Sequence, residues 1–132
     1  MKLTELAAAA GLDRPAEAEI TALACRSTEV TPGALFAALK GARADGRDYI
    51  PEAVARGAAA VLCAGAVGAP VPVLTSPEPR EALARMAAAF YGRPGDAMTL
   101  IAVTGTKGKT TTAHMLRDIL LADGRTVGMI GT

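Results

Sequence analysis

The chain has 132 residues, of which 14 are Lys or Arg and 13 are Asp or Glu, so its formal net charge is +1 at pH 7. This even charge and an aromatic content of 3% lack the basic patch and stacking surfaces of nucleic-acid-binding proteins, and we expect no nucleic-acid partner. No apolar run is long enough to span a bilayer and none resembles a secretory signal, so we expect a cytoplasmic protein without membrane insertion. Cys25 and Cys63 lack metal-ligand spacing, and we expect both to be buried, reduced thiols.

The first part of the chain alternates between helical and strand patterns. A helix is predicted over residues 3–10, with Thr4 as its N-cap and Gly11 as its stop. Asp48 is expected to cap a second helix that extends to residue 56. Strands are expected at 35–39, 58–63 and 71–74, and a further apolar run covers 20–24. This alternation predicts an α/β domain.

A longer helix is predicted next, opened by Ser76 as N-cap. Its apolar positions follow the spacing of one helix face: Leu83, Met86, Ala87 and Phe90. The glycine- and proline-containing stretch 92–95 then breaks the pattern. We therefore expect a first domain over residues 1–93 and a second that begins at residue 94.

The most informative stretch is residues 99–116, TLIAVTGTKGKTTTAHML. An apolar run at 100–103 predicts a strand, two glycines follow, and a helical pattern begins at Lys109. Glycines let the backbone approach a polyphosphate closely, and a helix N-terminus adds positive potential. Lys109 would then reach the β- and γ-phosphates, and the Thr110 hydroxyl would hold Mg²⁺. The usual motif needs a glycine where this chain has Val103, so we interpret the loop as a shortened variant.

The second domain is expected to be incomplete. After the helix, which Gly124 should stop, a single further strand is predicted at residues 127–130. A nucleotide-binding α/β domain needs several more strands, so we expect the chain to stop inside it.

Two segments together resemble the Mur ligases, ATP-dependent enzymes that form the amide bonds of bacterial peptidoglycan. The first covers residues 27–36 and continues through Gly41, Asp45, Gly46 and the positions 49–50, 53, 57–58 and 61–62. The second covers residues 90–94 and 100–111. The likeness is greatest to the MurE type, the UDP-N-acetylmuramyl-tripeptide synthetases.

This resemblance implies a small N-terminal α/β domain that holds the uridine diphosphate of the substrate, followed by the first βαβ unit of an ATP-binding central domain. It implies substrate contacts at Cys25, Ser27, Ala42, Arg43 and Ala44. It implies ATP contacts at Gly105, Thr106, Lys107, Gly108, Lys109, Thr110 and Thr111, with Lys109 catalytic and Thr110 a Mg²⁺ ligand.

The implied reaction joins an amino acid, meso-diaminopimelate or lysine, to the D-glutamyl carboxylate of UDP-MurNAc-L-Ala-D-Glu through an acyl phosphate. Residues 1–132 alone are expected to be inactive. The sequence leaves open a MurF-type ligase that adds D-Ala-D-Ala, and a stand-alone UDP-sugar-binding module without catalysis. Folylpolyglutamate synthetases share the loop style but lack the preceding uridine domain. The oligomeric state is also open.

Overall fold

The structure is a computed structural model that describes residues 1–13 and 15–131, and its contacts divide the chain into two compact units, Met1–Ala97 and Met98–Thr132. The boundary predicted between residues 93 and 94 falls at the start of a short 3-10 helix, η3 (Pro94–Ala97), that ends the first unit. No helix within the described residues has the length and apolar character needed to cross a membrane.

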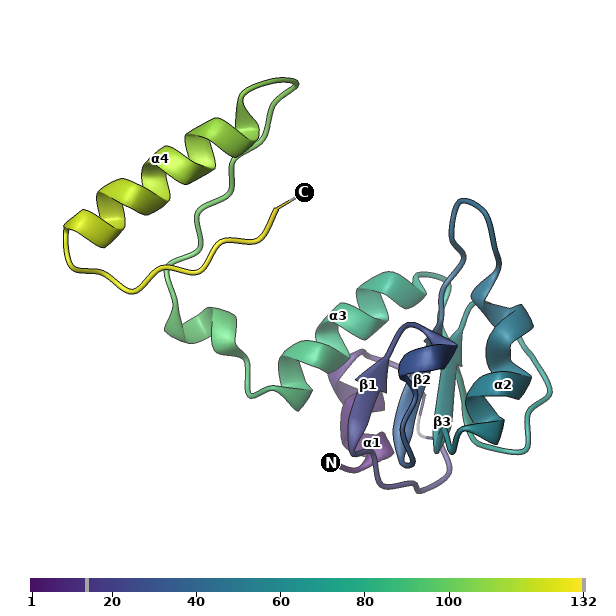
Figure 1. Cartoon of the computed structure of the whole chain (residues 1–132). Helices are drawn as coiled ribbons and strands as arrows, with labels where there is room; N and C mark the ends of the chain where they lie inside the picture. The colour runs from purple at the N-terminus through teal and green to yellow at the C-terminus, as the bar shows by residue number, and fades with distance from the viewer. Residues whose placement is uncertain (14, 132) are drawn as a thin grey trace. The chain divides into compact units, whose positions relative to one another are not determined.

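The first unit is an α/β fold built on one parallel sheet (Figure 1). Its strands lie in sequence order and are β1 (Ala22–Ala24), β2 (Ala34–Ala38), β3 (Ala60–Cys63) and β4 (Val73–Thr75). Its helices are α1 (Leu3–Ala9), α2 (Ile50–Ala55) and α3 (Pro79–Phe90), and short 3-10 helices occur at η1 (Ser27–Glu29) and η2 (Gly46–Tyr49). The predicted α/β class is therefore confirmed.

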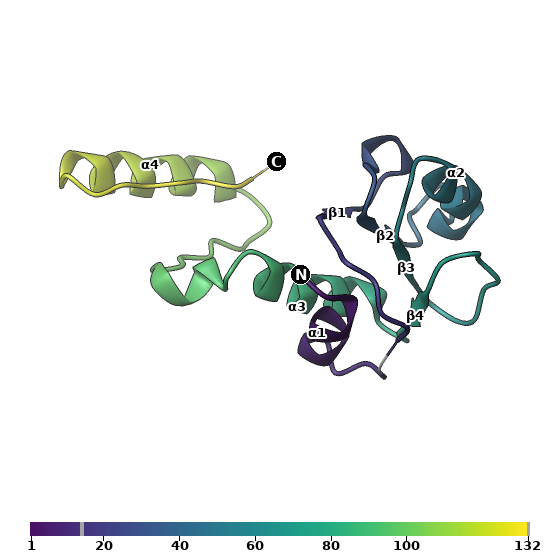
Figure 2. The ribbon, with the colours of Figure 1, turned by 90° about the horizontal axis from the view of Figure 1, so that it is seen from below.

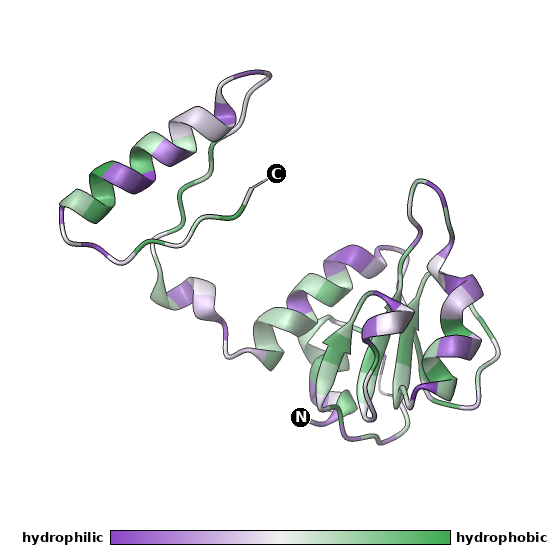
Figure 3. Cartoon of the chain, in the orientation of Figure 1, coloured by the Kyte–Doolittle hydropathy of each residue, from purple (hydrophilic) through white to green (hydrophobic). Residues whose placement is uncertain are grey.

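Helices cover both faces of this sheet (Figure 2). On β2, Leu35 and Ala37 pack into the cluster that holds α1 and α3, whereas Phe36 packs into the cluster that holds α2. Alternation of this kind follows from the two-residue period of a strand, and burial on both faces explains why the strands are continuously apolar. Figure 3 shows the apolar residues gathered along the strands and on the inward sides of the helices.

Because all four strands are parallel, their carboxyl ends meet at one edge of the sheet. The loop that follows β2 projects beyond this edge (Figure 1). Its base is closed by an antiparallel bridge between Lys40 and Asp45, and the N–H of Gly46 donates to the carbonyl of Leu39 at 3.0 Å. Ligands of parallel α/β sheets bind at this edge, so the fold itself indicates where a site should lie.

Three predicted helix caps are wrong. Thr4 lies inside α1, whose N-cap is Lys2; the backbone N–H of Lys2 donates to Glu5 at 2.9 Å. Asp48 lies inside η2, which delays the start of α2 to Ile50.

Ser76 caps a turn ahead of α3, where its hydroxyl accepts from the N–H of Glu78 at 3.1 Å. The first turn of α3 contains Pro79, and its N-cap is Glu78. Before α2 and α3 the chain makes a short turn that contains the polar residue, whereas α1 begins one residue ahead of Thr4.

The second unit contains the predicted helix, α4 (Lys109–Ala122), but neither predicted strand. The runs 100–103 and 127–130 have no strand assignment. A strand exists only through hydrogen bonds to a neighbouring strand, and no described residue pairs with either run. Most of their apolar side chains are accordingly exposed, with Leu100 at 75% and Ile130 fully exposed.

Candidate nucleotide-binding sites

A shallow pocket of about 430 Å³ lies at the carboxyl edge of the sheet in the first unit. It brings together all five residues predicted to contact the uridine nucleotide. The pocket is lined by Cys25, Ser27, Phe36, Leu39, Gly41, Ala42, Arg43, Ala44, Gly46 and Tyr49. Their contact with a ligand stays a prediction.

Each part of this pocket comes from a different element. Cys25 follows β1 directly, and Ser27, which is 7% exposed, begins η1. Phe36 from β2 lines the pocket but is 1% exposed, so the aromatic surface comes from the exposed ring of Tyr49 in η2. Exposed Arg43 lies on the loop that follows β2 and adds a positive charge. An apolar surface with a few polar groups at its rim is the usual composition of a small-molecule site.

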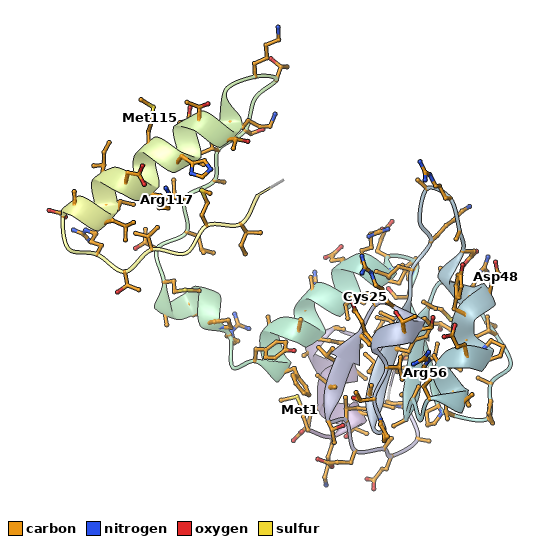
Figure 4. The ribbon with its side chains drawn as sticks, viewed as in Figure 1. Met1, Cys25, Asp48, Arg56, Met115 and Arg117 are labelled. Carbon is orange, nitrogen blue, oxygen red and sulfur yellow. The ribbon has the colours of Figure 1, made fainter. Side chains whose placement is uncertain are left out.

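The expectation of two buried thiols is wrong for Cys25. Cys63 is buried, and its Sγ donates to the carbonyl of Gly65 at 3.4 Å, but Cys25 is exposed at the point where the chain leaves the sheet (Figure 4). Partial desolvation and the carboxylate of Glu29 raise the pKa of Cys25, while the positive charge of Arg80 acts in the opposite direction. Cys25 is therefore an accessible thiol, protonated at neutral pH, on the wall of the candidate site.

Sequence reasoning missed an ion pair beside the pocket. Arg47 Nη2 lies 2.7 Å from Asp45 Oδ2, Arg47 Nε donates to the same carboxylate at 3.0 Å, and the N–H of Arg47 donates to Asp45 Oδ1 at 3.0 Å. These hydrogen bonds from Arg47 lower the pKa of Asp45 to about 2. The sequence analysis named Asp45 and Gly46 as part of the family resemblance but assigned no function to Asp45 and did not pair it with Arg47.

A second depression, of about 290 Å³, adjoins this ion pair. It lies where β2 and β3 end and α3 begins, and its lining includes Lys40, Asp45, Arg47, Glu78 and Arg80. Arg80 Nη2 donates to the backbone carbonyl of Lys40 at 2.9 Å. The base of the projecting loop is therefore tied to the first turn of α3.

The second unit holds the predicted phosphate loop. Gly105 has φ +150° and Gly108 has φ +75°, backbone conformations that residues with a side chain rarely adopt. Gly108 is also the N-cap of α4, and its carbonyl accepts the first helical hydrogen bond, from the N–H of Thr112 at 2.9 Å. The N–H groups at positions 109–111 precede that bond and are free to bind a ligand.

The side chain of Lys109 closes this loop. Its Nζ donates to the carbonyl of Gly105 at 2.6 Å. All seven residues predicted to contact ATP, positions 105–111, are exposed, so the loop presents its amides and the ammonium groups of Lys107 and Lys109 to solvent. An anion at this end of α4 would meet positive potential from both. Farther along α4, Met115 projects outward and is 62% exposed (Figure 4).

Comparison with known proteins identifies two domains of one family, in the order expected. Residues 19–91 match the Mur ligase family, catalytic domain, and residues 103–132 match the Mur ligase middle domain. The chain is 48% identical over 121 residues to a UDP-N-acetylmuramyl-tripeptide synthetase of Roseiflexus sp., covering 89% of this chain and 24% of that protein.

It is 45% identical over 114 residues to the UDP-N-acetylmuramoyl-L-alanyl-D-glutamate–2,6-diaminopimelate ligase of Geobacillus thermodenitrificans, covering 86% of this chain and 23% of that protein. The chain thus spans about a quarter of the length of the curated relatives it matches.

Solved structures agree with this assignment. A crystal structure of MurF from Acinetobacter baumannii superposes with a TM-score of 0.70 at 30% identity, over 92% of this chain and 28% of that one. MurF ligase from Thermotoga maritima in complex with ADP superposes with a TM-score of 0.59 at 33% identity, over 76% of this chain and 23% of that one. The resemblance deduced from two sequence segments is confirmed, and the chain belongs to the Mur ligase family.

Proposed function

We propose that this chain supplies the uridine-nucleotide pocket and the phosphate loop of a MurE-type, ATP-dependent ligase. Such an enzyme would add the third amino acid to UDP-MurNAc-L-Ala-D-Glu. The observation that carries the proposal is that one chain combines a pocket lined by all five expected substrate residues with a glycine-rich loop at a helix N-terminus. The names of the curated relatives, which are 45% and 48% identical, support the MurE type.

The pocket in the first unit has the composition that a uridine group requires. Tyr49 offers exposed aromatic surface to a flat base, and Ser27 offers a hydroxyl group for hydrogen bonding. Arg43 carries a positive charge on the loop, where an anionic diphosphate would be attracted.

The loop in the second unit fits a triphosphate with magnesium. The free N–H groups at 109–111 and the ammonium of Lys109 are donors without nearby acidic side chains in the first turn of α4. When bound, ATP supplies the phosphoryl group that converts the D-glutamyl carboxylate into an acyl phosphate, and Mg²⁺ supplies positive charge. Lys109 would neutralise negative charge on the phosphates, and the Thr110 hydroxyl would hold the magnesium ion.

The name of the Geobacillus relative favours diaminopimelate over lysine as the added amino acid. The MurF type is the second candidate, because the solved MurF structures also match the chain. Their identities of 30% and 33% are lower than those of the MurE-type relatives. We also propose that residues 1–132 form no amide by themselves, because they cover only about a quarter of the length of the relatives named for this activity.

A thiol footprint tests the uridine pocket. Iodoacetamide should modify exposed Cys25 and spare buried Cys63, which serves as the internal control. Millimolar uridine diphosphate should slow modification of Cys25 several-fold, whereas adenosine diphosphate should not, because Cys25 lines the pocket. Equal modification with and without uridine diphosphate would contradict the assignment of this pocket.

Turnover tests the ligase. In a protein of the relatives' length that carries this chain, ADP release should require both UDP-MurNAc-L-Ala-D-Glu and diaminopimelate. Lys109→Ala should abolish release, whereas Arg125→Ala should not, because Arg125 is an exposed cation paired with Asp123 near the other end of α4. A requirement for D-Ala-D-Ala instead would establish the MurF type. Uridine protection of Cys25 without any ATP turnover would establish a binding module.

A further inference from the structure

The loop at positions 41–44, which carries three of the predicted substrate contacts, is held by a residue outside the pocket. Arg80 lies in the first turn of α3 and does not line the pocket. Its Nη2 nevertheless donates to the carbonyl of Lys40 at 2.9 Å, and the two residues are 40 positions apart in the sequence. Among the described residues, this hydrogen bond links α3 to the base of the loop at positions 41–44.

The carbonyl that Arg80 holds lies at the closing point of the loop. Lys40 forms the antiparallel bridge with Asp45, and the N–H of Gly41 donates to the carbonyl of Ala44 at 2.9 Å. The ion pair of Asp45 with Arg47 fixes the opposite side of the same closing point. A displacement of the Lys40 peptide would therefore shift both ends of the loop.

The helix is the more rigid partner in this link. Ala82 and Met86 of α3 are buried in the core, at 4% and 0% exposure, whereas all four loop residues at 41–44 are exposed. Residues packed in a core have a single arrangement, whereas an exposed loop samples many. The hydrogen bond therefore transmits the fixed position of α3 to the loop.

We propose that Arg80 is a positioning residue for the uridine nucleotide: by holding the Lys40 carbonyl, it presets the loop that carries Ala42, Arg43 and Ala44. A loop already in its bound shape loses less conformational entropy when the ligand arrives, which strengthens binding. This inference rests on the proposed uridine pocket. The charge of Arg80 also acts on Cys25, which lines that pocket.

The test compares three variants of the 132-residue chain. Arg80→Met removes the donor but keeps an aliphatic stem, and Arg80→Lys keeps a cationic donor. Arg85→Met is the matched control, because Arg85 lies on the same helix, is 57% exposed, pairs only locally with Glu81 at 2.6 Å and lines neither depression. Hydrogen exchange measures the protection of the Gly41 and Gly46 amides, whose hydrogen bonds close the loop. Modification of Cys25 by iodoacetamide at increasing uridine diphosphate concentrations measures the affinity for that nucleotide.

For Arg80→Met we expect exchange at both amides to rise and the uridine diphosphate midpoint to increase by about five- to tenfold, the effect of losing one solvent-exposed hydrogen bond of ordinary strength. The urea midpoint of unfolding should stay near that of the parent. Arg80→Lys should restore most of the affinity, and Arg85→Met should match the parent throughout.

Unchanged affinity and exchange in Arg80→Met would overturn the positioning role while leaving the uridine pocket intact. Failure of Arg80→Lys to recover any affinity would also overturn it, because a cationic donor would then not be what matters. A parent chain whose Cys25 is not protected by uridine diphosphate would overturn the proposed pocket itself, and the positioning role with it.

Discussion

Gly46 is the position where one added methyl group should do the most damage to the loop. A Cβ built on Gly46 would lie 2.6 Å from both the backbone N and O of Leu39, and 2.7 Å from the carbonyl carbon of Ala38. All three atoms are backbone at the end of a buried strand, so no flexible side chain can move aside. Ordinary contact begins at 3.4 Å, so the two segments would have to separate by about 0.8 Å.

Two costs add up in Gly46→Ala. Inserting a methyl group into a packed region costs about 1–3 kcal/mol. The hydrogen bond from the Gly46 N–H to the Leu39 carbonyl, now 3.0 Å, would be broken or stretched at about 0.5–1.5 kcal/mol. We therefore expect a loss of roughly 1.5–4.5 kcal/mol in the free energy of unfolding, equivalent to about 7–22 °C in Tm for a unit of this size.

Urea unfolding followed by far-ultraviolet circular dichroism measures this loss, since the sequence contains no Trp to serve as a fluorescent probe. Gly68→Ala is the matched control, because its Cβ would meet nothing within 4 Å. We expect Gly68→Ala to lie within about 0.5 kcal/mol of the parent. If Gly46→Ala is as stable as Gly68→Ala, the close approach of Gly46 to the end of β2 does not exclude a side chain at position 46.

Two further predictions concern the core and the loop. Met86→Ala, at a fully buried position, should lower the free energy of unfolding by about 2–5 kcal/mol in the same urea experiment, whereas Met115→Ala, at a 62% exposed position, should change it by less than about 0.5 kcal/mol. NMR titration of Asp45 should give a midpoint of about 2, and Arg47→Met should raise it toward about 3.9. The pKa of Asp45 is lower in the folded state than in the unfolded state. The pair with Arg47 therefore adds to the free energy of unfolding above the unfolded pKa, and this contribution is lost as pH falls through about 2. A midpoint unchanged in Arg47→Met would contradict the assigned cause.

Most of the first unit could be predicted from the sequence because its signals are local. Apolar runs bounded by glycine and proline located the strands after β1, and the helical spacing of Met86 and its neighbours located the buried face of α3. The five predicted ligand residues came from the family resemblance, and the fold brings them together because they follow β1 and β2, whose parallel carboxyl ends lie side by side.

What could not be predicted depends on partners distant in sequence or on small shifts in the backbone. Nothing in the local pattern connects Arg80 with Lys40, which meet only after the sheet and α3 have packed. The exposure of Cys25 depends on the point where β1 ends, and an apolar neighbourhood in sequence gave no sign of it. The run at 100–103 predicted a strand, but the pairing that makes a strand lies outside the run itself.

The two outer strands of the sheet, β1 and β4, are three residues long, shorter than β2 and β3 between them. An edge strand offers its unpaired N–H and C=O groups as a template for pairing with another molecule, and a short edge strand offers few of these groups. The sheet should therefore resist templated growth into ordered aggregates, even though its central strands are among the most apolar parts of the chain.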